Sequence, residues 1–419
     1  MESFCFGFME GKARNMKVIY IHQYFKTPEE GGAIRSYHLA KGLVEAGIEV
    51  EIITSHNQGH YDLKIIEGIK VHYLPVAYDN TFGFYKRSLS FLQFVYKAKN
   101  LIKKLPRPDV LYITSTPLTT GLIGLWAKRK LALPFIFEVR DLWPEAPIQV
   151  GAIKNKLFQK AMYQLEERIY RHALKIVALS PGILIYIRNK TNRKDLFLIP
   201  NFCDVAFFSP VIKEYYYEGL KGKAVISYTG AMGQVNALEK LIYLAKEAQD
   251  QSKDWQFILM GKGDKERDLK KLTRELGLLN LKFYPFGNKS EVRKLLALTD
   301  VSYISFADFP ILKTNSPNKF FDSLAMGKAI LINHKGWVYD LVKDHHLGIY
   351  HHPKDHLKTI CQLEDFLNSS SALKKAQSNA RELALFHFSK DKAVKKLLFV
   401  LDPTKYKLNT TDGVYTRTA

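Results

Sequence analysis

The chain has 419 residues, 47% of them hydrophobic, and this length exceeds the usual size of one hydrophobic core and predicts two domains. Its three cysteines, Cys5, Cys203 and Cys361, are far apart, which argues against disulfides and a structural zinc site. No apolar run reaches the roughly 18–20 residues of a membrane-spanning helix. The formal net charge of +21 predicts an anionic partner: a nucleic acid, a membrane surface or a phosphorylated substrate.

The first half of the chain alternates apolar strands with helices. Residues 17–23 are predicted to form a short buried strand, residues 27–32 a glycine-bearing loop, residues 33–45 a helix and residues 48–54 a second strand. Further strands are expected at 71–75, 110–114, 135–139, 175–179 and 197–199, and helices at 91–104, 119–130 and 154–172. This alternation predicts a parallel sheet covered on both faces.

Residues 82–107 interleave basic, aromatic and aliphatic side chains, and no acidic residue lies between Asp79 and Asp109. Such a helix is typical of a membrane interface, where aromatic side chains enter the acyl region and lysines meet anionic headgroups. The alternative is a core helix with a solvated basic face. The residues expected at a membrane surface are Phe84, Lys86, Arg87, Phe91 and Lys97.

Residues 199–210 contain two prolines and turn-forming residues, so they are predicted to be a linker. The alternation then starts again, with strands at 224–229, 256–260, 281–284, 301–305 and 329–332. We therefore predict an α/β protein with two Rossmann-like, doubly wound domains at residues 16–205 and 206–388. Residues 1–15 are expected to be an extension, and residues 389–419 a C-terminal helix and flexible tail.

The most informative segment is 314–330, in which a polar loop runs into a short helix that begins near Asn318. The first amides of such a helix lack internal partners and carry partial positive charge, so they predict an anion site with Ser316, Asn318 and Lys319 beside it. Asp322 lies one turn further on and can accept hydrogen bonds from hydroxyl groups. A phosphate cradle next to a hydroxyl acceptor suits a nucleotide-sugar. The alternative is an ordinary loop-helix-strand unit.

Two loops in the first half follow strand ends, where open α/β sheets bind ligands. Gly31 and Gly32 permit backbone amides to approach a phosphate, with Arg35 in the helix that follows. Arg140 can neutralise phosphate charge and Asp141 can accept from a sugar hydroxyl. For this second loop the alternative is an internal network of arginine and carboxylate.

Two loops of the second half occupy the corresponding positions. Gly230 and Gly233 follow its first strand and permit close approach of a diphosphate, and Lys262 follows the next strand and can reach an anion. No zinc-binding histidine pattern is present, so neither a metal nor another cofactor is predicted.

Five stretches together resemble the family-4 retaining glycosyltransferases of the GT-B fold, and in particular the amino-sugar transferases of bacterial surface-polysaccharide synthesis. The stretches are residues 21–25 with 31–35, 140–145, 199–201 with 208–210, 261–264, and 316–328. The resemblance implies two Rossmann-like domains that face a cleft, with a nucleotide-sugar donor on the second and the acceptor on the first. It assigns the ribose hydroxyls to Asp322 and implies chemistry without a metal, with Arg140, Asp141 and Lys319 as the catalytic candidates.

The chain departs from the family pattern in three places. Family members usually carry two glutamates eight positions apart, and here Thr314 stands at the first position, with Asp308 as a candidate substitute. Met232, Gln234 and Asn236 occupy the stretch that often holds an arginine and a lysine, and Arg140 takes the place of the usual histidine.

The sequence thus predicts a transferase that moves a sugar, UDP-linked and of the N-acetylated amino type, to a polyprenyl-diphosphate-linked acceptor at the inner face of the plasma membrane. The rival interpretations are a nucleotide-sugar 2-epimerase and an inactive scaffold protein. A nucleic-acid-binding protein is disfavoured because no recognition module is found.

Overall fold

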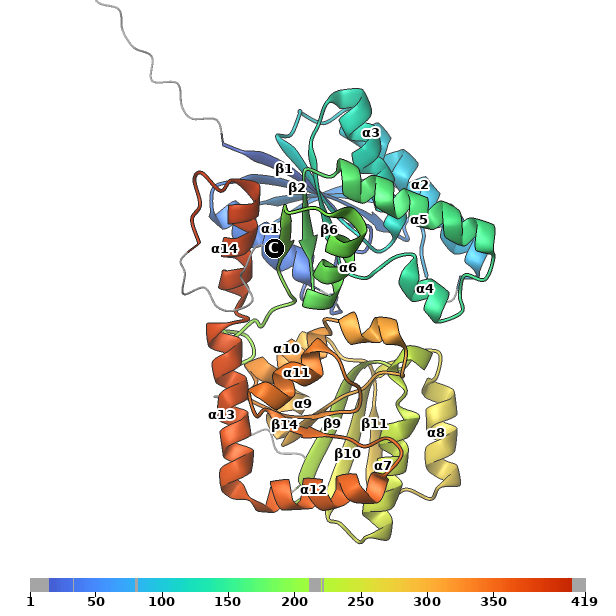
Figure 1. The fold of residues 1–419 in the computed structure, drawn as a ribbon, viewed down its shortest axis with the longest axis vertical. Coiled ribbons are helices and arrows are strands. Elements are labelled where there is room, and N and C mark those ends of the chain that lie inside the picture. The colour runs from blue at the N-terminus through green and yellow to red at the C-terminus, as the bar shows by residue number, and fades with distance from the viewer. Residues whose placement is uncertain (1–14, 33, 80–81, 211–219, 221, 409–419) are drawn as a thin grey trace, which may run out of the picture.

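The computed structural model describes residues 15–32, 34–79, 82–210, 220 and 222–408 and places them in two lobes, each built around one sheet (Figure 1). In the described part of the first lobe, the eight-stranded sheet has the order β3-β4-β2-β1-β5-β6-β7-β8, and its pairs are parallel except for β3 with β4. The strands are β1 (Lys17–Ile21), β2 (Glu49–His56), β3 (Asp62–Ile66), β4 (Ile69–Pro75), β5 (Val110–Thr114), β6 (Phe135–Val139), β7 (Lys175–Ala178) and β8 (Leu196–Leu198).

Helices cover both faces of this sheet because its strands alternate between two apolar cores. Val18 and Tyr20 of β1 pack toward α1 and α14, while Ile19 and Ile21 pack toward α2, α3, α5 and α6. The helices are α1 (Arg35–Glu45), α2 (Phe84–Ile102), η1 (Leu118–Thr120), α3 (Gly121–Leu131), α4 (Glu145–Gln149), α5 (Lys156–His172) and α6 (Pro181–Thr191).

The second lobe repeats this design with a parallel sheet that has six strands in the described residues, in the order β11-β10-β9-β12-β13-β14. Its strands are β9 (Ala224–Ala231), β10 (Trp255–Lys262), β11 (Leu281–Tyr284), β12 (Val301–Ile304), β13 (Ala329–Ile332) and β14 (Gly348–Tyr350). Its helices are η2 (Gln234–Asn236), α7 (Glu239–Asp250), α8 (Glu266–Glu275), α9 (Lys289–Leu298), η3 (Pro310–Thr314), α10 (Asn318–Ala325), α11 (Trp337–Asp344), α12 (His356–Asn368) and α13 (Ser370–Phe386).

The chain crosses between the lobes twice, and the two crossings are hydrogen-bonded to each other. The Cys203 amide donates to the Phe388 carbonyl at 2.7 Å, and the Lys390 amide donates to the Cys203 carbonyl at 2.9 Å. After the second crossing, α14 (Lys390–Leu401) packs on α1 of the first lobe, as Figure 1 shows. The C-terminal helix therefore completes the core of the N-terminal lobe.

The structure confirms the predicted fold class, two parallel-sheet Rossmann-like lobes. Strands β3 and β14 and helices α4 and α6 are among the elements that were not expected, and β3 belongs to an antiparallel hairpin outside the β-α alternation. The domain boundaries stay predictions, and the expected extension and tail lie mainly outside the described residues.

Candidate active site

The N-terminus of α10 lies between the lobes and has no side-chain cap among the described residues. The helix is held by its buried face, which carries Phe320, Phe321 and Leu324, while Asn318 and Lys319 in its first turn are half-buried. Its free amides therefore place partial positive charge at the interlobe cleft.

Lys319 adds a full charge and has no carboxylate within ion-pair distance among the described residues. Its Nζ donates to the Tyr228 hydroxyl at 2.5 Å and lies 3.8 Å from the centre of the Tyr228 ring. Desolvation by the surrounding protein lowers the pKa of the Lys319 ammonium to about 7. Gly230 leaves room for this side chain, because a Cβ at Gly230 would lie 3.1 Å from Lys319 Cε.

These groups line a cavity of about 320 Å³ between the lobes, which we call the donor-side cavity because the sequence predicts a donor on the second lobe. The first lobe contributes Gly32, and its neighbour Gly31 (φ +69°) closely approaches Asn288 and Phe286 of the second lobe. The second lobe contributes the remaining wall, which includes Thr229, Gly230, Asn236, Phe286, Lys289, Phe306, Asn318, Lys319 and Asp322. Several residues predicted from separate loops thus meet around one space.

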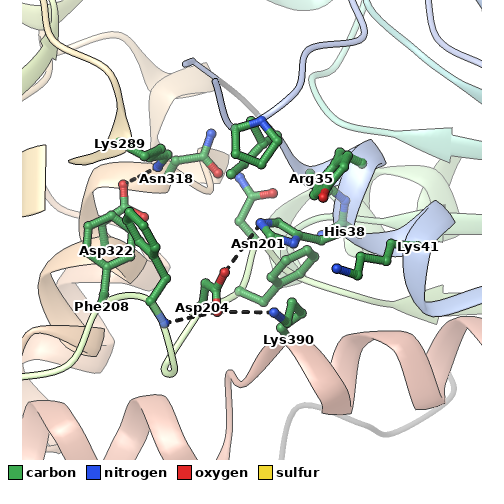
Figure 2. A pocket seen from close by; sticks show the side chains of 15 residues that line it. Arg35, His38, Lys41, Asn201, Asp204, Phe208, Lys289, Asn318, Asp322 and Lys390 are labelled. Carbon is green, nitrogen blue, oxygen red and sulfur yellow. Dashed lines mark hydrogen bonds and ion pairs between the residues drawn. The ribbon is translucent and has the colours of Figure 1, made fainter. Parts of the chain in front are cut away.

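Asp322 lines both this cavity and a second one of about 210 Å³ (Figure 2). The second cavity lies beside the two crossings between the lobes, and we call this the hinge side. Its Oδ2 accepts from Lys289 Nζ at 2.6 Å. Burial raises the pKa of the Asp322 carboxyl, and the Lys289 ammonium opposes that rise. Figure 2 also shows Asp204 of the linker beside His38 and Lys390, at 3.7 and 3.2 Å.

Three other predicted residues lie beside the donor-side cavity without lining it. Lys262 Nζ lies 4.6 Å from the centre of the Phe286 ring. Gly233 lies next to Asp264. Ser316 binds the linker, since its Oγ accepts from the Asn201 amide at 3.2 Å and its carbonyl accepts from Asn201 Nδ2 at 2.5 Å.

The prediction for Arg35 needs correction, because its guanidinium is buried and bound to other parts of the first lobe and the linker, although the residue also lines the second cavity. Its Nε donates to Glu138 Oε1 at 3.0 Å, and its NH groups donate to the carbonyls of Ile199 and Pro200 at 2.8 and 2.6 Å. Burial raises the pKa of Glu138, but Arg35 and Arg140 outweigh burial and hold it below its usual value. Arg35 therefore connects β6 to the linker rather than binding a phosphate.

Arg140 and Asp141 follow β6 in the first lobe and line neither cavity described above. Arg140 donates to His22 Nε2 at 3.3 Å, so this nitrogen is the acceptor and Nδ1 carries the proton toward Ser36 Oγ at 2.8 Å. Burial and the Arg140 charge hold the pKa of His22 well below its ordinary value, so its imidazole is neutral. Asp141 is exposed, yet nearby protein atoms desolvate its carboxyl and raise its pKa.

Two family models match the chain in succession: "Glycosyl transferase 4-like domain" over residues 30–201 and "Glycosyl transferases group 1" over residues 218–383. The chain belongs to the family-4-like glycosyltransferases of the GT-B fold. No curated protein sequence matches the chain.

Solved structures share the fold at low sequence identity. Sucrose-phosphate synthase from Thermosynechococcus elongatus is 15% identical with a TM-score of 0.76, over 93% of this chain and 99% of its own. HepE from Anabaena, in complex with UDP-glucose, is 15% identical with a TM-score of 0.66, over 93% and 100%. WaaG, a glycosyltransferase involved in lipopolysaccharide biosynthesis, is 14% identical with a TM-score of 0.66, over 92% and 100%.

In this glycosyltransferase, the departures from the family pattern differ in their distance from the cavities. Thr314 donates from its hydroxyl to the Ile311 carbonyl at 2.7 Å and packs against Gly182 of α6 in the first lobe. Asp308, the candidate substitute, is exposed and lines neither cavity. Asn236, from the stretch that lacks the usual cations, does line the donor-side cavity.

The residues predicted for a membrane surface divide between two sides of α2, and two of them need correction. Phe91 is half-buried and stacks on Tyr78 with ring centres 5.8 Å apart, and Lys97 donates to the Pro75 carbonyl at 2.7 Å. Lys86 and Arg87 are exposed beside Phe82. The side chain of Phe84 lies outside the described residues. No helix in the described ranges is long and apolar enough to cross a membrane.

Sequence reasoning missed Lys289, Tyr228 and Phe286. Phe286 and Lys289 follow β11, and the end of this strand lies at the same edge of the sheet as the predicted loops. Their position after a strand was therefore the one sequence signal that could have indicated them. Across the described residues, no group of three or more histidine, cysteine or acidic side chains is placed to hold a metal ion.

The Arg35 to Glu138 contact predicts a stability effect. Arg35→Met leaves a buried carboxylate unpaired and should lower the free energy of unfolding by about 3–5 kcal/mol, measured by urea denaturation. The exposed control Arg129→Met should change it by less than about 0.5 kcal/mol. A loss of phosphate binding without a loss of stability in Arg35→Met would contradict the structural role.

Proposed function

We propose that this glycosyltransferase moves a sugar from a UDP-linked donor to a lipid-linked saccharide acceptor in surface-polysaccharide synthesis, with retention of anomeric configuration. The observation that carries the proposal is the convergence of Lys319, the uncapped amides of α10 and Asp322 on one cavity. HepE, with the same fold, is solved with UDP-glucose, and TarM is solved with UDP. The resemblance favours an N-acetylated amino sugar.

The bond between sugar and diphosphate breaks as negative charge grows on the leaving diphosphate. Donors that are already in place stabilise this charge best, because they need no reorganisation during the reaction. Here the α10 amides and Lys319 are fixed in position, and the proposal therefore requires no metal ion. In the front-face mechanism that the family implies, a diphosphate oxygen takes the acceptor proton, and Arg140 and Asp141 face the acceptor from the first lobe.

The first test measures transfer with UDP-, GDP- and ADP-sugars and a polyprenyl-diphosphate saccharide, with the product anomer read by NMR. Lys319→Ala should lower kcat about 100-fold or more, because it removes a charge that acts on the leaving group. Asp322→Ala should mainly weaken donor affinity. The exposed neighbour Lys313→Ala is the matched control. Full transfer by both site variants would place the site elsewhere, and a changed sugar without acceptor would indicate an epimerase.

The affinity for the donor is expected to depend on pH. Because the pKa of Lys319 is lowered to about 7 in the empty site, a bound diphosphate raises it, and binding above pH 7 takes up a proton. The affinity for UDP-glucose, whose diphosphate charge is constant near neutral pH, should therefore fall as pH rises above 7, by up to about tenfold per unit.

Calorimetric titration between pH 6 and 9 measures this dependence. Lys319→Arg should abolish the slope, because a guanidinium stays charged throughout this range. Lys262→Arg should keep it. An unchanged slope in Lys319→Arg would assign the titration to another group.

The membrane part of the proposal rests on an outward stripe of α2 that differs from the predicted one. Tyr85, Leu89, Leu92 and Tyr96 recur at helical spacing and are 88, 57, 54 and 68% exposed. The exposed cations Lys86, Arg87, Lys103, Lys104 and Arg107 lie on or just after the same helix. An apolar stripe flanked by cations fits an anionic lipid surface.

Flotation with vesicles of phosphatidylglycerol and phosphatidylcholine tests this surface. Leu89→Gln/Leu92→Gln should reduce the bound fraction severalfold while leaving UDP-glucose affinity and stability unchanged, since both side chains are exposed. The control Ile65→Gln/Leu279→Gln replaces two apolar residues elsewhere that are even more exposed, at 74 and 87%. Equal flotation of both double variants would contradict the assignment to α2.

A further inference from the structure

The ion pair of Lys289 and Asp322 forms part of the wall that the two interlobe cavities share, together with Asn318. Lys289 is the first residue of α9, and Asp322 lies in the second turn of α10. Their side chains are only 13 and 12% exposed, and Figure 2 shows the dashed contact between them. The pair is therefore largely withdrawn from solvent at the edge of the donor-side cavity.

We propose that Lys289 is a positioning residue that fixes the Asp322 carboxylate for the 2′- and 3′-hydroxyls of the donor ribose, and so selects ribonucleotides over deoxyribonucleotides. The inference rests on the proposed function, in which Asp322 accepts from the ribose.

The two carboxylate oxygens of Asp322 differ in their contacts, and only one of them is occupied within the described residues. Oδ2 accepts from Lys289 Nζ at 2.6 Å, and Oδ1 has no hydrogen-bond partner among the described residues. An ionised carboxylate only accepts hydrogen bonds, whereas a protonated one presents a donor. A cation on Oδ2 thus keeps Oδ1 as an acceptor and holds it in one orientation.

The other cations near Asp322 contact other groups, so Lys289 is the cation that can orient its carboxylate. On the hinge side, His38 and Lys390 lie against Asp204, and Lys41 pairs with Glu67. Lys319 on the donor side donates to Tyr228, and the neighbouring thiol of Cys203 donates to the Phe321 carbonyl. Asp204 adds a negative charge that favours the protonated form of Asp322. Within the described chain, Lys289 alone lies within ion-pair distance of Asp322.

The test compares the Kd of UDP-glucose with those of its 2′-deoxy and 3′-deoxy analogues, by calorimetry between pH 5.5 and 8.5. All three ligands carry the same diphosphate, so the titration of Lys319 cancels in the ratio of their Kd values. The wild-type ratio should be about 10- to 100-fold in favour of the ribonucleotide, because the lost bond goes to a charged acceptor.

Lys289→Met should lower this ratio at pH 7 and bring it toward one as pH falls. Without Lys289 the pKa of Asp322 rises, so the carboxyl takes up a proton at a higher pH than in the wild type. Lys289→Arg should restore most of the ratio and its pH profile, and Asp322→Ala should give a ratio near one at every pH. Lys282→Met, which replaces an exposed lysine on β11, should leave the profile unchanged.

The variant Lys289→Met/Asp322→Asn removes the unpaired carboxylate and checks by urea denaturation that the fold tolerates methionine at this position. A ratio and pH profile in Lys289→Met that equal those of the wild type would overturn the role of Lys289 while leaving UDP-sugar binding in place. A wild-type protein that binds none of the three ligands would overturn the proposed function, and the role of Lys289 with it.

Discussion

A lysine charge that the protein itself leaves unneutralised is the constraint on which this site depends. Lys319 lies at the N-terminus of α10, where the helix amides already carry partial positive charge, and its ammonium contacts the Tyr228 hydroxyl and the ring faces of Tyr228 and Phe306. A ring face offsets only part of the cost of desolvating an ammonium group. The cavity is therefore electrostatically incomplete, and an anion that enters it gains both the lysine and the amides without breaking an ion pair.

The charge on Lys319 can act on a substrate only if the first lobe keeps a fixed position relative to α10. A continuous set of buried polar contacts fixes that position. Arg35 joins Glu138 at the end of β6 to the linker carbonyls, and Asn201 joins the linker to Ser316 just before α10. The loop that carries Arg140 is thereby connected to the helix that carries Lys319. Arginine suits this position because its planar group donates in several fixed directions at once.

The sequence was most informative where structure is local. Strand alternation, the start of α10 and the glycine loops follow from periodicity and from turn chemistry within a few residues. The sequence was least informative about which cations are already paired with a carboxylate. The carboxylate partners of Arg35 and Lys289 lie 103 and 33 residues away along the chain. The prediction of which side of α2 faces outward was wrong for another reason. Apolar residues occupy two sides of this helix, so their spacing alone does not distinguish the inward Phe91 from the outward Leu92.

Lys289 and Lys319 have different surroundings in the donor-side cavity, and this difference suits the order of groups in the proposed nucleotide-sugar. Lys289 and Asp322 cancel each other's charge, and in the proposed complex this neutral pair faces the ribose hydroxyls. In the proposed complex, the bound diphosphate raises the pKa of Lys319, and the protonated lysine and the helix terminus then provide about +1.5 charges beside it. A surface that binds polyanions generally spreads its charge along a backbone. Among the lysines that line the donor-side cavity, Lys289 is paired with Asp322 and Lys319 has no carboxylate within ion-pair distance in the described residues, whereas the exposed cations of α2 do not line this cavity.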